Sequence, residues 1–248
     1  MTTYSSANVA FLLIDGFSVL GVTTEISAES PLKREEVTPL GASAEVYASA
    51  GITSTKMSQK GYFDDATGSS HEALAGRNGT SRIICFGVEG NTIRKNFIGL
   101  SGAIQTQYDP GIKVGELHKS SAEYIGSAAK EDGKILHAHG AKTAATGNTQ
   151  ASSVNNGASS ASGGSGFFEL SALTLGGYTN FQAVLQDSAD NITFADITGG
   201  AFTAKTTSPA AQRLTLSGTI RQYTACRWAF SGAGSGNTAT FMAGIVRN

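Results

Sequence analysis

The chain has 248 residues, of which 40% are hydrophobic and only 15% are charged, and its formal net charge is −1. Charge-driven binding of nucleic acid and electrostatic anchoring to a membrane both need a basic excess, so this balance argues against them. With 31 glycines and only 4 prolines, the chain is rich in small residues. Its neutral surface is of the kind that proteins bury against copies of themselves.

The cysteines and the first ten residues indicate in which cellular compartment the protein is made. Cys85 and Cys226 have no second cysteine or histidine at ligand spacing, so we expect two buried, reduced thiols. The stretch Met1–Ala10 is polar and lacks a basic segment, which predicts no secretory signal. No apolar run approaches the ~18 residues of a membrane span. The sequence therefore predicts a soluble protein made in a reducing cytoplasm.

Short apolar or alternating runs, separated by turn residues, predict strands through the first part of the chain. In chain order they cover 9–14, 17–22, 44–47, 51–58, 83–86, 97–107, 113–117 and 123–125. One short helix is expected over His71–Ala75, because Ser69 or Ser70 can cap its start and Gly76 can end it.

The composition changes after residue 142. Residues 143–165 are almost entirely Ala, Ser, Thr, Asn and Gly, which predicts a linker or a long surface loop. Strands are expected again over 167–173, 181–186, 214–216, 223–230 and 240–246. The prediction is an all-β protein with a β-barrel or sandwich domain at 1–142, a linker at 143–165 and a β-sandwich domain at 166–248.

A six-residue pattern, F-x-D-x-T-G, occurs twice at a separation of 131 residues (194 − 63 = 131). In both places Asp and Gly suit a turn, and Phe can fill the core below it. Either the pattern recurs by chance, or the chain holds two related β-domains in tandem. The predicted structural turn residues are Phe63, Asp65, Thr67 and Gly68 in the first copy and Phe194, Asp196, Thr198 and Gly199 in the second.

The search for chemistry identifies no catalytic residue, metal ligand or cofactor site. His137 and His139 would share one face of a strand, but a metal site needs further ligands. The adjacent Asp64 and Asp65 suit a turn better than acid–base catalysis. The glycine-rich segment 232–236 lacks the spacing of a nucleotide-binding loop.

Six short segments carry a resemblance to a known family: Lys56–Asp65, Gly68–Leu74, Gly87–Gly90, Gly115–His118, Asp187–Asp196 and Ala239–Gly244. Together they resemble the tail tube (major tail) proteins of long-tailed bacteriophages. The resemblance implies a β-sandwich or barrel subunit with a flanking helix, which assembles into rings that stack around a DNA-conducting channel. Its implied partners are itself, other tail proteins and viral DNA passing through without sequence-specific binding, with no membrane. The implied location is the virion tail, assembled in the host cytoplasm.

The resemblance leaves the symmetry and the position in the virion open. Tube rings are commonly hexamers of one-domain subunits, and a trimer of a two-domain chain would mimic that symmetry. Long loops such as Ser30–Ala42 and Thr143–Gly166 are candidates for bridging stacked rings. The alternatives are a capsid decoration or spike protein and a carbohydrate-binding adhesin or hydrolase, in which sugar stacks on Trp228 or Tyr223.

Overall fold

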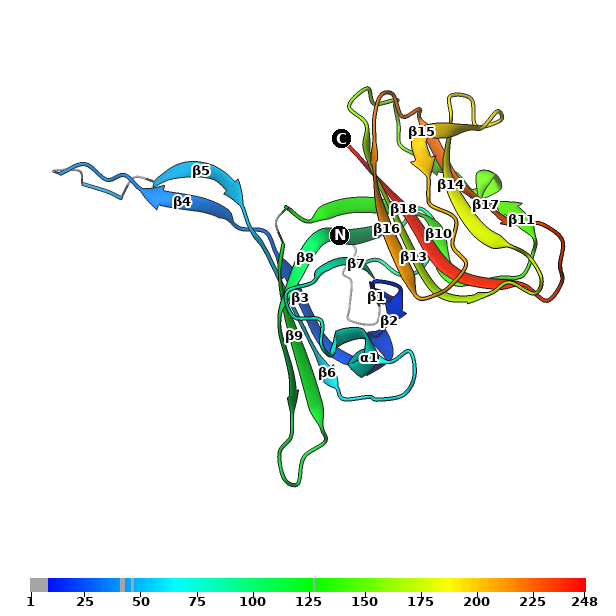
Figure 1. Cartoon of the computed structure of the whole chain (residues 1–248). Coiled ribbons are helices and arrows are strands. Elements are labelled where there is room, and N and C mark those ends of the chain that lie inside the picture. Colours follow the sequence, from blue (N-terminus) through cyan, green and yellow to red (C-terminus); the bar gives the residue numbers. More distant parts are fainter. Residues whose placement is uncertain (1–8, 41–42, 46, 127) are drawn as a thin grey trace.

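The computed structural model describes residues 9–40, 43–45, 47–126 and 128–248, and these residues form antiparallel sheets with one short α-helix (Figure 1). The all-β prediction is therefore confirmed. Most of the polar start lies outside the described residues, as do parts of the loop Ser30–Ala42 and of the strand predicted at 44–47.

The first half of the chain forms an N-terminal module, residues 12–126, around its own core. Its strands are β1 (Leu12–Ile14), β2 (Phe17–Ser18), β3 (Thr23–Glu29), β6 (Thr55–Tyr62), β7 (Ser81–Gly87), β8 (Asn96–Gly111) and β9 (Lys119–Gly126), with a 3-10 turn at Leu20–Val22. The strand order is β2-β1-β7-β8-β9-β6-β3. Within the described residues β2 and β3 do not pair, so this part of the sheet curls without closing into a barrel.

Helix α1 (Ser70–Leu74) packs against the core of this module. Ser69 is its N-cap, and Ala73 and Leu74 are fully buried. Gly76 follows the last turn with a positive φ of 68°. The helix predicted from Ser69, Ser70 and Gly76 is therefore confirmed.

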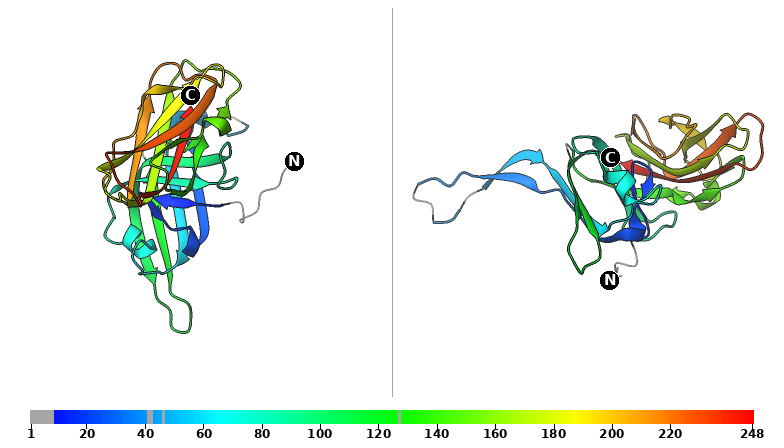
Figure 2. Two further views of the ribbon diagram at one scale, coloured as in Figure 1. Left: turned by 90° about the vertical axis from the view of Figure 1, so that its right-hand side faces the viewer. Right: turned by 60° about the horizontal axis from the view of Figure 1, so that its bottom comes forward.

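A hairpin of β4 (Leu32–Glu36) and β5 (Tyr47–Thr53) leaves the body of the module between β3 and β6 (Figures 1 and 2). It pairs only with itself among the described strands.

The second half forms a β-sandwich, the C-terminal module of residues 131–247. Its strands are β10 (Glu131–Lys142), β11 (Thr146–Asn148), β12 (Val154–Asn155), β13 (Gly164–Thr174), β14 (Asn180–Ser188), β15 (Ala195–Ala201), β16 (Ala210–Leu216), β17 (Tyr223–Ser231) and β18 (Thr238–Arg247), with a 3-10 turn at Gln150–Ser152. One layer is β16-β13-β18-β10, and the other is β15-β14-β17 with β11 and β12 beside β17.

The core of the sandwich is aromatic, and Phe241 lies near its centre. Its ring is 5.1 Å from that of Phe181, and 5.9 Å from those of Phe168 and Trp228, measured between centroids. Large side chains from both layers interdigitate here, which buries much apolar area per residue. This cluster accounts for why the strands at 167–173, 181–186, 223–230 and 240–246 were recognisable as apolar runs.

The two modules share one continuous sheet. Strand β10 pairs with β8 of the N-terminal module on one side and with β18 on the other. A third group of buried side chains lies where the modules meet, and it includes Phe97, Ile135, Phe167 and Met242.

Some predicted elements differ from the structure. The run at 17–22 is a two-residue strand followed by a 3-10 turn, and 113–117 is a turn between β8 and β9. Strand β8 runs on to Gly111, beyond the end predicted near Tyr108, because Pro110 at this edge still pairs with Ser120.

The domain boundaries at 142 and 166 remain a prediction. The structure shows how the intervening residues 143–165 lie: β11 and β12 both pair with β17. Val154 is buried in the sandwich core. This small-residue segment thus follows the edge of the second layer.

Candidate assembly surfaces

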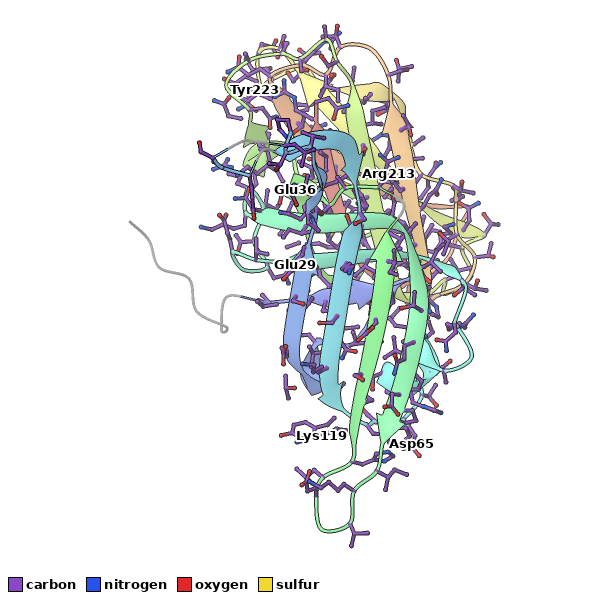
Figure 3. All side chains as sticks on the ribbon, turned by 90° about the vertical axis from the view of Figure 1, so that its left-hand side faces the viewer. Glu29, Glu36, Asp65, Lys119, Arg213 and Tyr223 are labelled. Atoms are coloured by element: carbon purple, nitrogen blue, oxygen red, sulfur yellow. The ribbon has the colours of Figure 1, made fainter. Side chains whose placement is uncertain are left out.

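Strands β3, β6, β9 and β8 lie side by side and present a mainly polar face to solvent (Figure 3). Their residues alternate between buried and exposed, as they do in a sheet with one face on a core. The half-exposed Ile104 and Ile125 lie opposite each other on this face. On the outer face Glu25 forms an ion pair with Lys60 at 3.1 Å, and Glu29 lies opposite Lys56. Charges of both signs therefore alternate across this face.

Two hollows lie on the same face. One is lined in part by Glu25, Lys60 and Lys119, and the other in part by Lys56 and Glu123. Paired charges and hydroxyl groups of this kind form polar contacts with a neighbouring surface or with water.

Strand β3 forms an edge of the sheet. Within the described residues it pairs with β6 alone, so its other side has no strand partner. An edge of this kind leaves backbone N–H and C=O groups free to pair with a further strand. Strand β3 is seven residues long, from Thr23 to Glu29, which is enough for a further strand to pair along it.

The loop between β8 and β9 carries the most exposed apolar cluster of the molecule's described part. Val114 is fully exposed, Ile112 is 80% exposed and Leu117 is 71% exposed. The loop extends beyond the end of the sheet (Figures 1 and 3). The strand prediction at 113–117 missed it, although Gly111 and Gly115 were the turn signals that could have identified it.

The base of this loop is held by aromatic contacts. The ring of His118 stacks on Phe63 with centroids 4.2 Å apart, and the Phe63 N–H donates to the His118 carbonyl at 3.0 Å. On the other side His71 Nδ1 is 3.0 Å from the hydroxyl of Tyr108. The loop therefore projects from a fixed support.

Phe63, Asp65, Thr67 and Gly68, the first copy of the repeated pattern, lie in the turn that leads into α1. The half-buried Phe63 contacts the loop base, as described, whereas Asp65 and Thr67 are exposed. It is Asp64 that accepts the turn hydrogen bond, from the N–H of Ala66 at 3.0 Å. Gly68 has a φ of +80°.

Phe194, Asp196, Thr198 and Gly199, the second copy, have a different local structure. Apart from Phe194, these residues lie within β15, so the expected turn is wrong for this copy. Its Asp196 forms a two-bond pair with Arg227 on β17, at 2.5 and 2.9 Å. Asp196 pairs with an arginine, whereas Asp65 is exposed, so the two aspartates have different surroundings. That the two halves are related repeats stays a prediction.

The two histidines of β10 are structural. His137 is buried with its ring stacked on Phe241 at 3.9 Å, and its Nδ1 is 3.2 Å from the Phe241 carbonyl oxygen. Burial, together with the charge of Lys142, lowers the pKa of His137 to about 3, so the imidazole is neutral. His139 instead contacts Ser171 through Nε2 at 2.8 Å. Across the described ranges, no three His, Cys, Asp or Glu side chains are grouped to hold a metal ion.

The aromatic residues considered for sugar stacking differ in exposure. Trp228 is only 6% exposed and belongs to the sandwich core, so it offers no open platform. Tyr223 is half-buried and lines a shallow hollow with Arg94 and Lys134.

A buried carboxyl group lies where the modules meet. Glu169 on β13 is fully buried, and its Oε2 accepts a 2.5 Å hydrogen bond from the N–H of Gly16 in the β1–β2 turn. Its Oε1 has no hydrogen-bond partner among the described residues. The neighbouring Asp15 is paired with Arg82. Burial, and next the charge of Asp15, raise the pKa of Glu169 well above its usual range.

Burial also raises the pKa of the neighbouring Cys85 thiol, with the charge of Glu169 as the next cause. Both cysteines are buried and free, as expected.

No helix in the described part of the chain has the length and apolar character to cross a membrane.

No family model and no curated protein matches the chain. Among solved structures, it is similar to a chain of the virion of a native gene transfer agent particle, at 12% identity and a TM-score of 0.41, over 52% of this chain and 98% of that one. A chain from the tail of an empty gene transfer agent particle with C6 symmetry is similar at 12% identity and a TM-score of 0.40, over 52% of this chain and 97% of that one. The SPP1 Dit protein, described as a paradigm of the hub adsorption apparatus in Gram-positive infecting phages, is similar at 10% identity and a TM-score of 0.35, over 95% of this chain and 98% of that one. At these identities and TM-scores, the similarities support no conclusion about the function of this chain.

Proposed function

We propose that the chain is a structural subunit of a phage tail, which assembles with copies of itself into rings that stack into a tube for the passage of DNA. It acts without catalysis or a cofactor. The observation that carries the proposal is the edge of β3, which has no second strand partner among the described residues, on a sheet whose outer face is mainly polar and carries acidic and basic side chains next to each other.

Lateral association follows from the edge. A second copy that adds a strand to β3 satisfies backbone groups that a single copy leaves to water, and the same step repeated around an axis gives a ring. The low charge content of the chain favours such self-association, because little charge has to be desolvated.

The sheet face suits the wall of a channel. Its acidic and basic side chains neutralise each other in pairs such as Glu25 with Lys60. On the described part of this face Lys60 is paired with Glu25 and Lys56 lies opposite Glu29, so phosphate groups passing it meet acidic side chains next to basic ones. Trimeric and hexameric rings are both compatible with this proposal.

The test is negative-stain electron microscopy of the purified chain across a concentration series, combined with hydrogen exchange. Rings or tubes are expected, and the β3 amides should become protected on assembly. The β6 amides, already paired on both sides, serve as the internal control because they should be protected before and after. A chain that stays monomeric at high concentration, with other tail proteins added, contradicts the proposal.

A further inference from the structure

A hollow of about 370 Å³, called here the junction hollow, is lined by side chains from both modules. Arg94 comes from the loop between β7 and β8 of the N-terminal module, and Lys134 comes from β10. Asn155 of β12, Asn191 of the loop between β14 and β15, and Tyr223 at the start of β17 also line it. Five segments that are distant in the sequence therefore meet at one place.

The junction hollow has a different charge from the hollows on the outer sheet face. Those two hollows are lined by acidic and basic side chains together, whereas no described carboxylate lines this one. Glu89 lies near Lys134, but its two carboxylate oxygens already accept hydrogen bonds from the N–H and the side-chain amide of Asn96, at 3.1 and 2.6 Å. Figure 3 shows Tyr223 in the C-terminal module, at the end of the molecule away from Lys119. The junction hollow is thus a cationic site separate from the sheet face.

The side-chain amides of the junction hollow have their oxygens occupied. The Asn155 oxygen accepts hydrogen bonds from the Gly157 N–H at 2.8 Å and from the side chain of Gln222 at 3.0 Å. The Asn191 oxygen accepts one from the hydroxyl of Ser153, which is 4% exposed. Within the described chain, neither Asn155 Nδ2 nor Asn191 Nδ2 has a hydrogen-bond partner. Amides that can only donate favour a ligand that only accepts, and an anion is such a ligand.

Arg94 is held in place from two sides. Its backbone N–H donates to the Ile135 carbonyl and its Nε donates to the Ser153 carbonyl, both at 3.0 Å. Its two Nη groups have no partner among the described residues, and they can bind two oxygens of one anion. The φ of Arg94 is +78°, a conformation that arginine rarely adopts and that proteins retain chiefly at functional sites. The guanidinium group is therefore oriented before any ligand arrives.

We propose that the junction hollow binds a phosphate group, free or carried by a small organic molecule, with Arg94 and Lys134 as its cationic contacts and Asn155 and Asn191 as amide donors. A phosphate group has more acceptor oxygens and more charge than a carboxylate, so it uses more of these donors. The volume is in the range of sites that hold small organic ligands, and the half-buried ring of Tyr223 offers an apolar surface to the organic part. The proposal does not depend on ring assembly.

The test is a ligand-detected NMR titration of the full chain with glucose 6-phosphate, in about 0.15 M salt and at a protein concentration where no assembly occurs. Inorganic phosphate and glucose are titrated in the same way. We expect glucose 6-phosphate to bind at least about 10-fold more tightly than glucose. Inorganic phosphate that binds as tightly as glucose 6-phosphate identifies the free anion as the ligand, and weaker binding identifies a phosphorylated organic molecule.

Two variants test the cationic contacts. Arg94→Gln and Lys134→Gln each remove a charge-assisted hydrogen bond and should weaken the binding of glucose 6-phosphate about 10-fold. Lys134 Nζ has no hydrogen-bond partner in the described structure, so Lys134→Gln should leave the fold and its circular dichroism unchanged. The matched control is Lys95→Gln, which makes the same change of charge at an exposed neighbour of Arg94 that does not line the hollow. Its affinity should change less than about 2-fold.

Three results overturn the inference. The first is that neither glucose 6-phosphate nor inorganic phosphate binds. The second is that Lys95→Gln weakens binding as much as Lys134→Gln does, which indicates a general effect of charge. The third is that a short oligothymidine binds more tightly than glucose 6-phosphate and loses this binding in both variants, which assigns the cations to a nucleic-acid backbone. A chain that forms no rings contradicts the proposed function alone and leaves this inference standing.

Discussion

Glu169 offers a sharp test of the junction between the modules. Its carboxyl group is buried, with one oxygen bonded to the Gly16 N–H. The other oxygen has no partner with hydrogen-bond geometry among the described residues, although the Cys85 thiol lies close to the carboxyl group. The groups around it are Asp15 from the β1–β2 turn and Arg82 and Cys85 from β7, and Arg82 is already paired with Asp15. We expect Glu169→Gln, which keeps a neutral acceptor of the same shape, to stabilise the protein increasingly as the pH rises.

The size of the effect follows from proton linkage. Because the pKa of Glu169 is raised in the folded state, folding retains a proton that the unfolded chain releases above its own pKa of about 4.3. The contribution is fully present below that pH and is lost as the pH rises toward the folded pKa, at about 1.4 kcal/mol per pH unit. Over the pH range in which the folded carboxyl group keeps its proton and the unfolded one has lost it, the free energy of unfolding of the wild type should fall relative to Glu169→Gln by about 1.4 kcal/mol per pH unit.

The assay is urea unfolding of both proteins at several pH values, at concentrations where neither assembles. Subtracting one curve from the other removes every group that titrates equally in both. Ile192→Ser, an exposed site of the same module that removes no titratable group, is the control and should run parallel to the wild type. A constant difference between Glu169→Gln and the wild type over this range would show that Glu169 is ionised in the folded protein and would refute the reasoning.

Three further perturbations test other parts of the structure. Phe241→Ala should cost about 3–5 kcal/mol in urea unfolding, because it empties the centre of the sandwich core. Gly16→Ala should destabilise the junction, since a Cβ there meets the backbone of Leu170 and Ala210 at 2.5 Å; amides of β1 should exchange faster, and unchanged exchange would contradict the contact. Arg227→Ala should bring the lowered pKa of Asp196 back toward its usual value in an NMR titration, with a stability loss under about 1 kcal/mol because the pair is partly exposed.

Elements with strong local signals were predictable from the sequence. The helix at Ser70–Leu74 has its capping serine and its terminal glycine within eight residues. Strands β17 and β18 carry apolar side chains at nearly every inward position, because they lie in the middle of their layers.

Elements that depend on distant partners were not predictable. Strand β10 contains charged residues and two histidines, and only its pairing with β8 and β18 shows it to be central. Strand β3 is polar because one face is exposed and one edge is free. Val114 and Leu117 led to a wrong strand prediction, because their side chains are apolar but exposed to solvent. Local patterns report burial, and at an assembly surface that burial comes from another molecule.

Because β10 belongs to both halves of the molecule, a pull applied to one half is passed to the other through rows of backbone hydrogen bonds. Severing the chain after Lys142 would leave Thr238–Arg247 without one of its two neighbours and would expose its backbone. The halves should therefore unfold as one mechanical unit.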